Sequence, residues 1–323
     1  MSEPALRELS CDVAEVLEQV ADTKWLLKGK HHTKLIDGFT FTMPDTPKNQ
    51  AVYPQQKAQA PGVGLPIARA VAITSLATAC VMELAVGPYK GKQTGEAALL
   101  RSILSALADG DIAYDHLIVW TRPERPPWMD AETYAQIPQT LTLRELRFNV
   151  VAPGRRTRTI DIITTLIDAN EYTSEDIASL YGFRWNSELD IRSIKSNLNL
   201  EHVRCKSPEM VRRELWTTLL AYNLIRCTAA GAALLHDKQP RQISFTSTCQ
   251  YVLASWMTLS LSPMTRERLD DYVKKVLKQI SRCEVANRPG RLEPRVVKRR
   301  PKPYHLMQQP RSELRRQLRK RCT

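Results

Sequence analysis

The residues best suited to chemistry stand together on one predicted helix late in the chain. At about 100° per residue, four of them fall within about 60° of one another on that helix: Tyr181, Arg184, Glu188 and Lys195. Arg192 lies beside them. Helix faces usually carry either apolar residues or scattered charges, whereas this face carries an aromatic ring, a carboxylate and several cations in one line. Taken alone, the spacing favours an ordinary surface stripe in which Glu188 pairs with Arg184 and Arg192.

The same four residues also form a specific spacing, Tyr-x2-Arg-x3-Glu-x6-Lys. This spacing resembles the signature of the IS4-family DDE transposases, enzymes that cut and join DNA strands. Other blocks of the chain are similar to segments of that family: residues 37–45, 88–95, 204–210, 220–225 and 288–304. The similarity runs from about residue 35 to residue 304, and its extent favours the family over a simple salt-bridge stripe.

The resemblance implies a two-metal reaction at phosphorus. Three carboxylates would hold two divalent ions about 4 Å apart, one activating water or a DNA 3′-hydroxyl and the other stabilising the leaving oxygen. Mg²⁺ or Mn²⁺ is expected, because hard ions prefer carboxylate oxygens. Asp37, on a predicted strand, and Glu188 are implied as two of the three ligands. The nearby Asp45 and Asp190 are interpreted as structural carboxylates.

The cations beside Glu188 are implied to hold DNA. Arg184 would grip a phosphate with its bidentate fork, and Lys195 would act as a point charge. Arg192 adds a further cation, and Tyr181 would give another phosphate or backbone contact. Double-stranded DNA, as transposon ends and as target, is therefore the expected partner, together with a homodimer that pairs two DNA ends.

The third carboxylate is where this chain departs from the family. The family places a second aspartate on a strand, followed by a helix and further strands, but residues 110–120 join the start of that block directly to its end. An internal deletion is therefore indicated, and it would remove core elements of the sheet. Asp115 is the candidate replacement ligand, with Asp111 as the alternative. A one-residue slip on a strand turns a side chain to the opposite face, so similar spacing does not guarantee a working triad.

The elements that must position these residues follow an α/β order. Residues 35–43 alternate apolar and polar side chains and predict a strand, and residues 68–75 and 79–86 predict two more. Residues 96–108 have helical spacing. Three strands and a helix are typical of the opening of a ribonuclease-H-like fold, although other α/β domains begin similarly. We expect a ribonuclease-H-like mixed sheet with a β-rich insertion that is partly deleted.

The following part of the chain predicts strands and then helices. The strands are expected at 117–120, 141–151 and 159–166. A capping box of Thr173 and Asp176 begins the helical part, whose second helix is expected at about 208–235. Trp120 and Trp128 lie in the insertion-like region, where related transposases stack an aromatic side chain on a flipped base. Core packing is the preferred interpretation of both tryptophans.

Charge and segment boundaries divide the chain into three predicted parts. Residues 1–34 contain a short amphipathic helix, interpreted as a remnant of an N-terminal region. Residues 35–236 would form the catalytic domain, and residues 237–323 a helical, basic C-terminal region. From Arg282 onward, fourteen Lys and Arg residues stand against three Glu residues, a net charge of +11 out of +13 for the chain. A block this basic usually binds a polyanion, although a solvated, partly disordered tail is the alternative.

Composition narrows the remaining classes of function. The seven cysteines form no CxxC pair, which argues against a disulfide framework or a zinc site. We expect no membrane span and no signal peptide, and hence a cytoplasmic, nucleoid-associated location. Two rivals to an active transposase stay open: a catalytically inactive DNA-binding remnant, and an RNA-binding protein that keeps only the basic tail.

Overall fold

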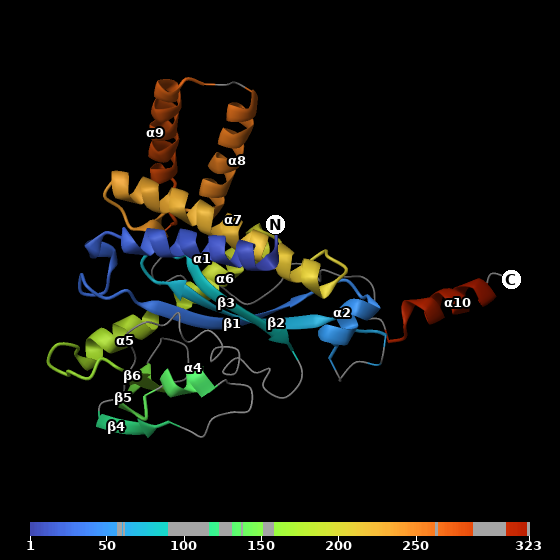
Figure 1. The fold of residues 1–323 in the computed structure, drawn as a ribbon, viewed down its shortest axis with the longest axis horizontal. Helices are drawn as coiled ribbons and strands as arrows, with labels where there is room; N and C mark the ends of the chain where they lie inside the picture. Colours follow the sequence, from blue (N-terminus) through green and yellow to red (C-terminus); the bar gives the residue numbers. More distant parts are fainter. Residues whose placement is uncertain are drawn as a thin grey trace. The chain divides into compact units, whose positions relative to one another are not determined.

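The computed structural model describes residues 1–56, 60, 62–89, 116–122, 131–136, 138–150, 158–261, 264–286 and 308–321 (Figure 1). They form mixed α/β structure in two compact units. Unit 1 combines Met1–Ala106 with Ser187–Thr323, and unit 2 is Leu107–Asn186. The predicted helix at 96–108 lies outside the described residues, as do both candidates for the third carboxylate, Asp111 and Asp115.

An antiparallel sheet forms the centre of unit 1. Its strands follow the order β1-β2-β3: β1 (Lys34–Thr42), β2 (Ile67–Ser75) and β3 (Val81–Pro88). They confirm the three strands predicted at 35–43, 68–75 and 79–86. From Ala70 onward every side chain of β2 is buried, as expected for a middle strand that is covered on both faces.

In the described residues of unit 1, the sheet is accompanied by four long helices: α1 (Glu3–Gln19), α7 (Pro208–Leu235), α8 (Phe245–Leu261) and α9 (Arg266–Arg282). Figure 1 shows α1 alongside α7, with α8 and α9 rising from α7 as a pair. The main core joins Phe39 and Phe41 of β1 to Leu215 and Tyr222 of α7. Burial of each such side chain stabilises the fold by roughly 1.5–3 kcal/mol. Shorter elements are α2 (Pro47–Val52), 3-10 turns at Thr23–Trp25 and Pro240–Gln242, and α10 (Arg311–Arg321).

The N-terminal helix α1 is an integral part of unit 1. The fully buried Asn223 of α7 donates to the carbonyl of Ser10 at 2.9 Å. Its amide also accepts from the N–H of Val81 and donates to the Val81 carbonyl, both at 2.9 Å. One amide side chain thus joins α1, α7 and β3. The division of the chain at residues 34/35 and 236/237 stays a prediction, since α1 and α8 belong to the same compact unit as the sheet.

Among the described residues, one helix, α7, is long and apolar enough by length and composition to cross a membrane. Half of that apolar stretch is buried inside the protein. The same helix carries Arg226, which is buried and ion-paired. A buried ion pair and a half-buried apolar face are the features of a core helix.

Unit 2 contains a second antiparallel sheet, in the order β4-β5-β6: β4 (His116–Thr121), β5 (Thr140–Val150) and β6 (Arg158–Thr164). These strands confirm the predictions at 117–120, 141–151 and 159–166. Two helices belong to the same unit: α4 (Ala131–Gln136) and α5 (Ser174–Gly182). The predicted capping box is present, with Asp176 N donating to Thr173 Oγ1 at 3.2 Å and Thr173 N donating to Asp176 Oδ2 at 3.0 Å. All described strands pair antiparallel, so the parallel strand of a mixed sheet is not among them.

The predicted core position of Trp120 is wrong. Trp120 lies on β4, which has a strand partner on one side, and its side chain is 53% exposed. Its neighbour Val119 is also exposed. The small core of unit 2 gathers instead around Leu146 and Ile162 of the other two strands. Trp128 lies outside the described residues.

The predicted single helix through residues 180–195 is also wrong. α5 ends at Gly182, and backbone N–H groups of Phe183 and Arg184 close a tight turn with i→i+3 bonds of 3.0 Å. Glycine has a low helix propensity, which favours a break at this point. A new helix, α6 (Trp185–Arg192), follows and passes into a π-helical turn at Ser193–Asn197. Because a π turn is wider than an α turn, the one-face arrangement expected from uniform helix geometry does not hold.

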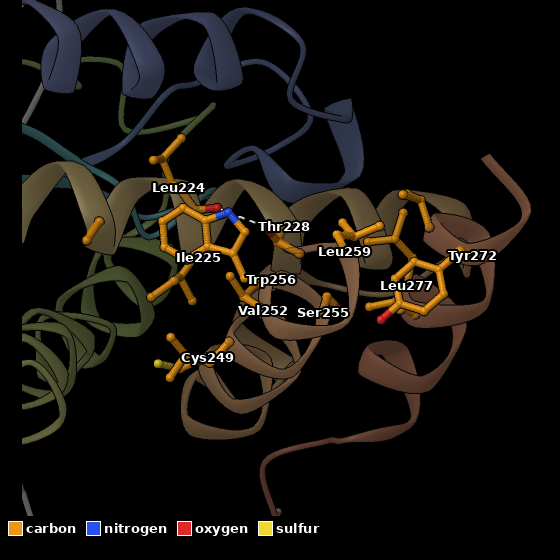
Figure 2. Close-up of a pocket in the computed structure, with 14 residues that line it drawn as sticks. Leu224, Ile225, Thr228, Cys249, Val252, Ser255, Trp256, Leu259, Tyr272 and Leu277 are labelled. Carbon is orange, nitrogen blue, oxygen red and sulfur yellow. Dashed lines mark hydrogen bonds between the residues drawn. The ribbon is translucent and has the colours of Figure 1, made fainter. Parts of the chain in front are cut away.

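An apolar groove of about 460 Å³ lies between α7, α8 and α9 (Figure 2). Leu224 of α7, Trp256 of α8 and Tyr272 of α9 contribute to its walls. Only Phe245 and Thr248 of α8 are buried, at the start of that helix. Much of the apolar surface of α8 therefore faces solvent, with Trp256 72% exposed.

Candidate active site

Asp37 lies in the middle of β1, opposite Ala72 of β2. Because side chains alternate between the two faces of a strand, Asp37 shares its face with Phe39 and Phe41. Both phenylalanines belong to the main core, whereas Asp37 is half-buried. Its Oδ1 accepts a hydrogen bond from the Gly38 N–H at 2.8 Å. The carboxylate therefore belongs to the sheet face that the helices cover.

Glu188 lies in the first turn of α6 and is also half-buried. Ile191 and Ile194, three and six residues further on, are buried in the same core cluster as Phe39. α6 and the π turn thus pack on the face of the sheet to which Asp37 belongs. Asp37 and the helix that carries Glu188 therefore lie on one side of one sheet, within unit 1.

A buried charge network anchors α6 two residues after Glu188. Asp190 is 1% exposed, and Arg226 Nη2 of α7 donates to its Oδ1 at 3.0 Å. Arg241 Nη1 lies 2.9 Å from the other oxygen, at ion-pair distance without hydrogen-bond geometry. Arg226 Nε also donates to the hydroxyl of Tyr222 at 3.0 Å. One carboxylate thus joins α6, α7 and the turn before α8, as the structural interpretation of Asp190 expects.

The network extends to the connection between β2 and β3. Arg241 donates from Nε to the carbonyl of Leu76 at 2.6 Å and from Nη2 to that of Ser75 at 2.8 Å. Burial raises the pKa of the Tyr222 hydroxyl, so this group stays protonated and donates to the carbonyl of Ala79 at 3.0 Å. Sequence reasoning missed the network. Its one local signal is Arg226, a charge inside the apolar run of α7.

The predicted DNA-binding cations divide between the two units. Lys195 lies half-buried in the π turn and Arg192 is exposed at the end of α6, both in unit 1. Within the described ranges Arg192 forms no ion pair, so the stripe expected from spacing alone lacks its Glu188–Arg192 pair. Tyr181 and Arg184 belong to unit 2, where the Arg184 guanidinium lies 5.9 Å from the centre of the Tyr181 ring.

The donor set at Asp37 and Glu188 fits a hard divalent ion, because both residues offer carboxylate oxygens. Two ligands are fewer than the three that the predicted chemistry needs. No cluster of three potential ligands occurs in the part of the chain that the structure describes. Asp45 does not join them: it is exposed and accepts from Gln50 Nε2 at 2.8 Å.

Comparison with known proteins places these features in a wider context. The transposase DDE domain matches residues 15–224. The chain is 27% identical over 303 aligned positions to the transposase InsG of insertion sequence element IS4 from Escherichia coli (strain K12), covering 83% of this chain and 68% of that protein. It is 36% identical over 64 residues to the transposase of insertion sequence element IS421 from Escherichia coli, covering 20% of this chain and 17% of that protein. The alignment has 303 positions, which is more than the number of residues in 83% of this 323-residue chain. The remaining positions are InsG residues that have no counterpart in this chain.

Proposed function

Because this chain belongs to the IS4 type of the DDE transposase family, we propose that it is an insertion-sequence transposase that binds DNA ends and cuts and joins strands. The observation that supports the proposal is that Asp37 shares its strand face with Phe39 and Phe41, whose core cluster also contains Ile191 and Ile194 just after Glu188. The antiparallel order β1-β2-β3 is consistent with the opening of a ribonuclease-H-like core. The reaction class is phosphoryl transfer assisted by divalent ions.

The residues of unit 1 would divide the work between metal and phosphate. Asp37 and Glu188 would hold Mg²⁺ or Mn²⁺, which when bound activates the attacking hydroxyl and stabilises the leaving oxygen. Lys195 and Arg192, on the same helical segment as Glu188, would neutralise phosphates of the bound strand. Asp190 would keep that segment fixed, since metal ligands must be held to well under an ångström.

The resemblance to the family supplies the other proposed site residues. Arg184 would hold a phosphate through its bidentate fork, with Tyr181 as a neighbouring contact. Asp115 is the proposed third ligand, and Asp111 is its alternative. The alignment with InsG contains positions without a counterpart in this chain, which supports a deletion within the chain. That deletion also favours a second candidate, a DNA-binding remnant of a transposase that no longer cuts.

The proposed partner is double-stranded DNA, with two copies of the chain pairing two ends. The tail of residues 282–323, with a net charge of +11, would add sequence-independent affinity for phosphates. The proposed location is the nucleoid in the cytoplasm. In this scheme residues 35–236 carry the catalysis and residues 237–323 add DNA affinity.

Nicking of a supercoiled plasmid by the purified full chain tests the proposal. Wild-type protein with Mg²⁺ or Mn²⁺ is compared with protein in EDTA, with Glu188→Gln, and with Asp45→Asn as a matched surface control. An active transposase nicks only with metal, loses nicking in Glu188→Gln and keeps it in Asp45→Asn. DNA binding without nicking by the wild type would instead support the inactive remnant.

A further inference from the structure

An open hollow of about 710 Å³ lies in unit 1, away from the carboxylates. Its rim joins the start of α2 to the loop that leads into α7, and Figure 1 shows α2 close to the first turns of α7. Lys48 lies on one side, and Arg204 and Lys206 lie on the other. The exposed Pro47 and Met210 also line the hollow.

The loop that carries two of these cations is held firmly through its backbone. The Glu214 carboxylate accepts from the N–H groups of Arg204 and Cys205 at 3.1 and 3.0 Å. Asn49 Nδ2 donates to the Cys205 carbonyl at 3.2 Å, and Thr46 Oγ1 donates to the next carbonyl along the chain at 2.9 Å. These hydrogen bonds are made by the backbone of the loop, and in the described part of the chain the charged side chains of Arg204 and Lys206 take no part in holding it.

The charges around the hollow differ from that of Arg212, a cation close by on α7. Lys48, Arg204 and Lys206 are all exposed, and none forms an ion pair within the described part of the chain. By contrast, Arg212 pairs with Glu3 at 2.7 Å on a neighbouring turn of α7. Three exposed cations that form no ion pair in the described part of the chain create a local positive potential that attracts a polyanion.

From this arrangement we propose that the hollow binds the sugar-phosphate backbone of duplex DNA, at a site separate from the metal ligands. Lys48 on one rim and Arg204 with Lys206 on the other would each take phosphate oxygens. The apolar side chains of Pro47 and Met210 would lie against deoxyribose. This proposal rests on the proposed function, because its ligand is DNA. The hollow would position the duplex without reading its sequence.

Salt-dependent binding of a fluorescent DNA duplex to the full chain tests the hollow. The variant Lys48→Gln/Arg204→Gln/Lys206→Gln is compared with a control of equal charge on α9, Lys274→Gln/Lys275→Gln/Lys278→Gln. The α9 lysines are exposed, so both variants should fold like the wild type, which thermal unfolding checks.

Each phosphate contact contributes about 0.9 to the slope of log affinity against log salt concentration. For the hollow variant, the magnitude of this slope should be smaller than that of the wild type by about two to three. The variant should also bind DNA on the order of 10- to 100-fold more weakly at low salt. The α9 control should lose less than about one from the slope. Equal losses in both variants, or an unchanged slope in the hollow variant, would overturn the proposal.

Two further outcomes separate this proposal from the proposed function. If the hollow variant keeps the wild-type DNA slope but loses affinity for a polyglutamate peptide, the hollow binds an acidic protein segment and the DNA proposal is overturned. If the wild-type chain binds no duplex at all, the transposase proposal is overturned together with the hollow. Normal DNA binding by Glu188→Gln with loss of nicking, beside an unchanged slope in the hollow variant, would overturn the hollow alone.

Discussion

Removing the Asp190 carboxylate is expected to destabilise unit 1 strongly. In Asp190→Ala, the Arg226 side chain, 7% exposed, loses its acidic partner. Arg241 keeps the two carbonyls that it already binds, so the uncompensated charge falls mainly on Arg226. Breaking a buried ion pair from one side costs about 3–5 kcal/mol, because the remaining charge stays out of water.

An exposed ion pair on the same helix gives the matched control. Arg213 Nη2 lies 2.5 Å from the Glu209 carboxylate in an i,i+4 pair on α7. Such pairs contribute about 0.3–0.5 kcal/mol. In a unit of this size, 1 kcal/mol corresponds to about 2–4 °C in Tm. Asp190→Ala should therefore lower the Tm of unit 1 by roughly 6–20 °C, and Arg213→Ala by less than about 2 °C.

Differential scanning calorimetry of the two variants measures both shifts. The double variant Asp190→Leu/Arg226→Met should recover part of the loss, because apolar replacement of both partners removes the buried charge. A Tm shift for Asp190→Ala no larger than that of Arg213→Ala would refute the assignment of this network as the anchor of α6.

Three further predictions concern packing, capping and thiol reactivity. Trp216→Ala, at a 5% exposed position, should cost about 3–5 kcal/mol, whereas Trp256→Ala, at an exposed position, should cost less than about 0.5 kcal/mol; equal urea midpoints would contradict this. Thr173→Ala should lower the stability of α5 by about 1 kcal/mol, and unchanged hydrogen exchange in its first turn would contradict the cap. Burial raises the pKa of the Cys11 thiol to about 12 and that of Cys205 to about 11. The thiolate is the reactive form, so iodoacetamide should label both slowly at pH 8 and faster at higher pH, and labelling at the rate of a free cysteine would contradict these shifts.

Local patterns predicted the strands of both units closely. The strand at Phe39 and Phe41 follows from alternation, because one face of β1 meets the core and the other does not. The capping box at Thr173 follows from chemistry within four residues. Features set by neighbouring residues can be read from the chain without knowledge of its tertiary contacts.

The features that sequence reasoning missed depend on distant residues or on small departures from ideal geometry. Asp190 and Arg226 are 36 positions apart, so their pairing is decided by how α6 packs on α7. The helix expected through Glu188 breaks at Gly182 because of a local turn that periodicity does not register. Core packing is the interpretation that the sequence favours for Trp120, but β4 is an end strand among the described strands of its sheet and the Trp120 side chain is exposed.

The claim that Asp37 and Glu188 hold the same metal ion is tested most directly by Mn²⁺ binding, measured from the paramagnetic resonance of the free ion. The chains compared are the wild type, Asp37→Asn, Glu188→Gln, their double variant, and Asp45→Asn as a control. We predict that each single substitution weakens Mn²⁺ affinity by about tenfold or more, that the double variant adds little further loss, and that Asp45→Asn binds like the wild type. Affinity that is unchanged by both substitutions, or losses that simply add in the double variant, would contradict a shared site.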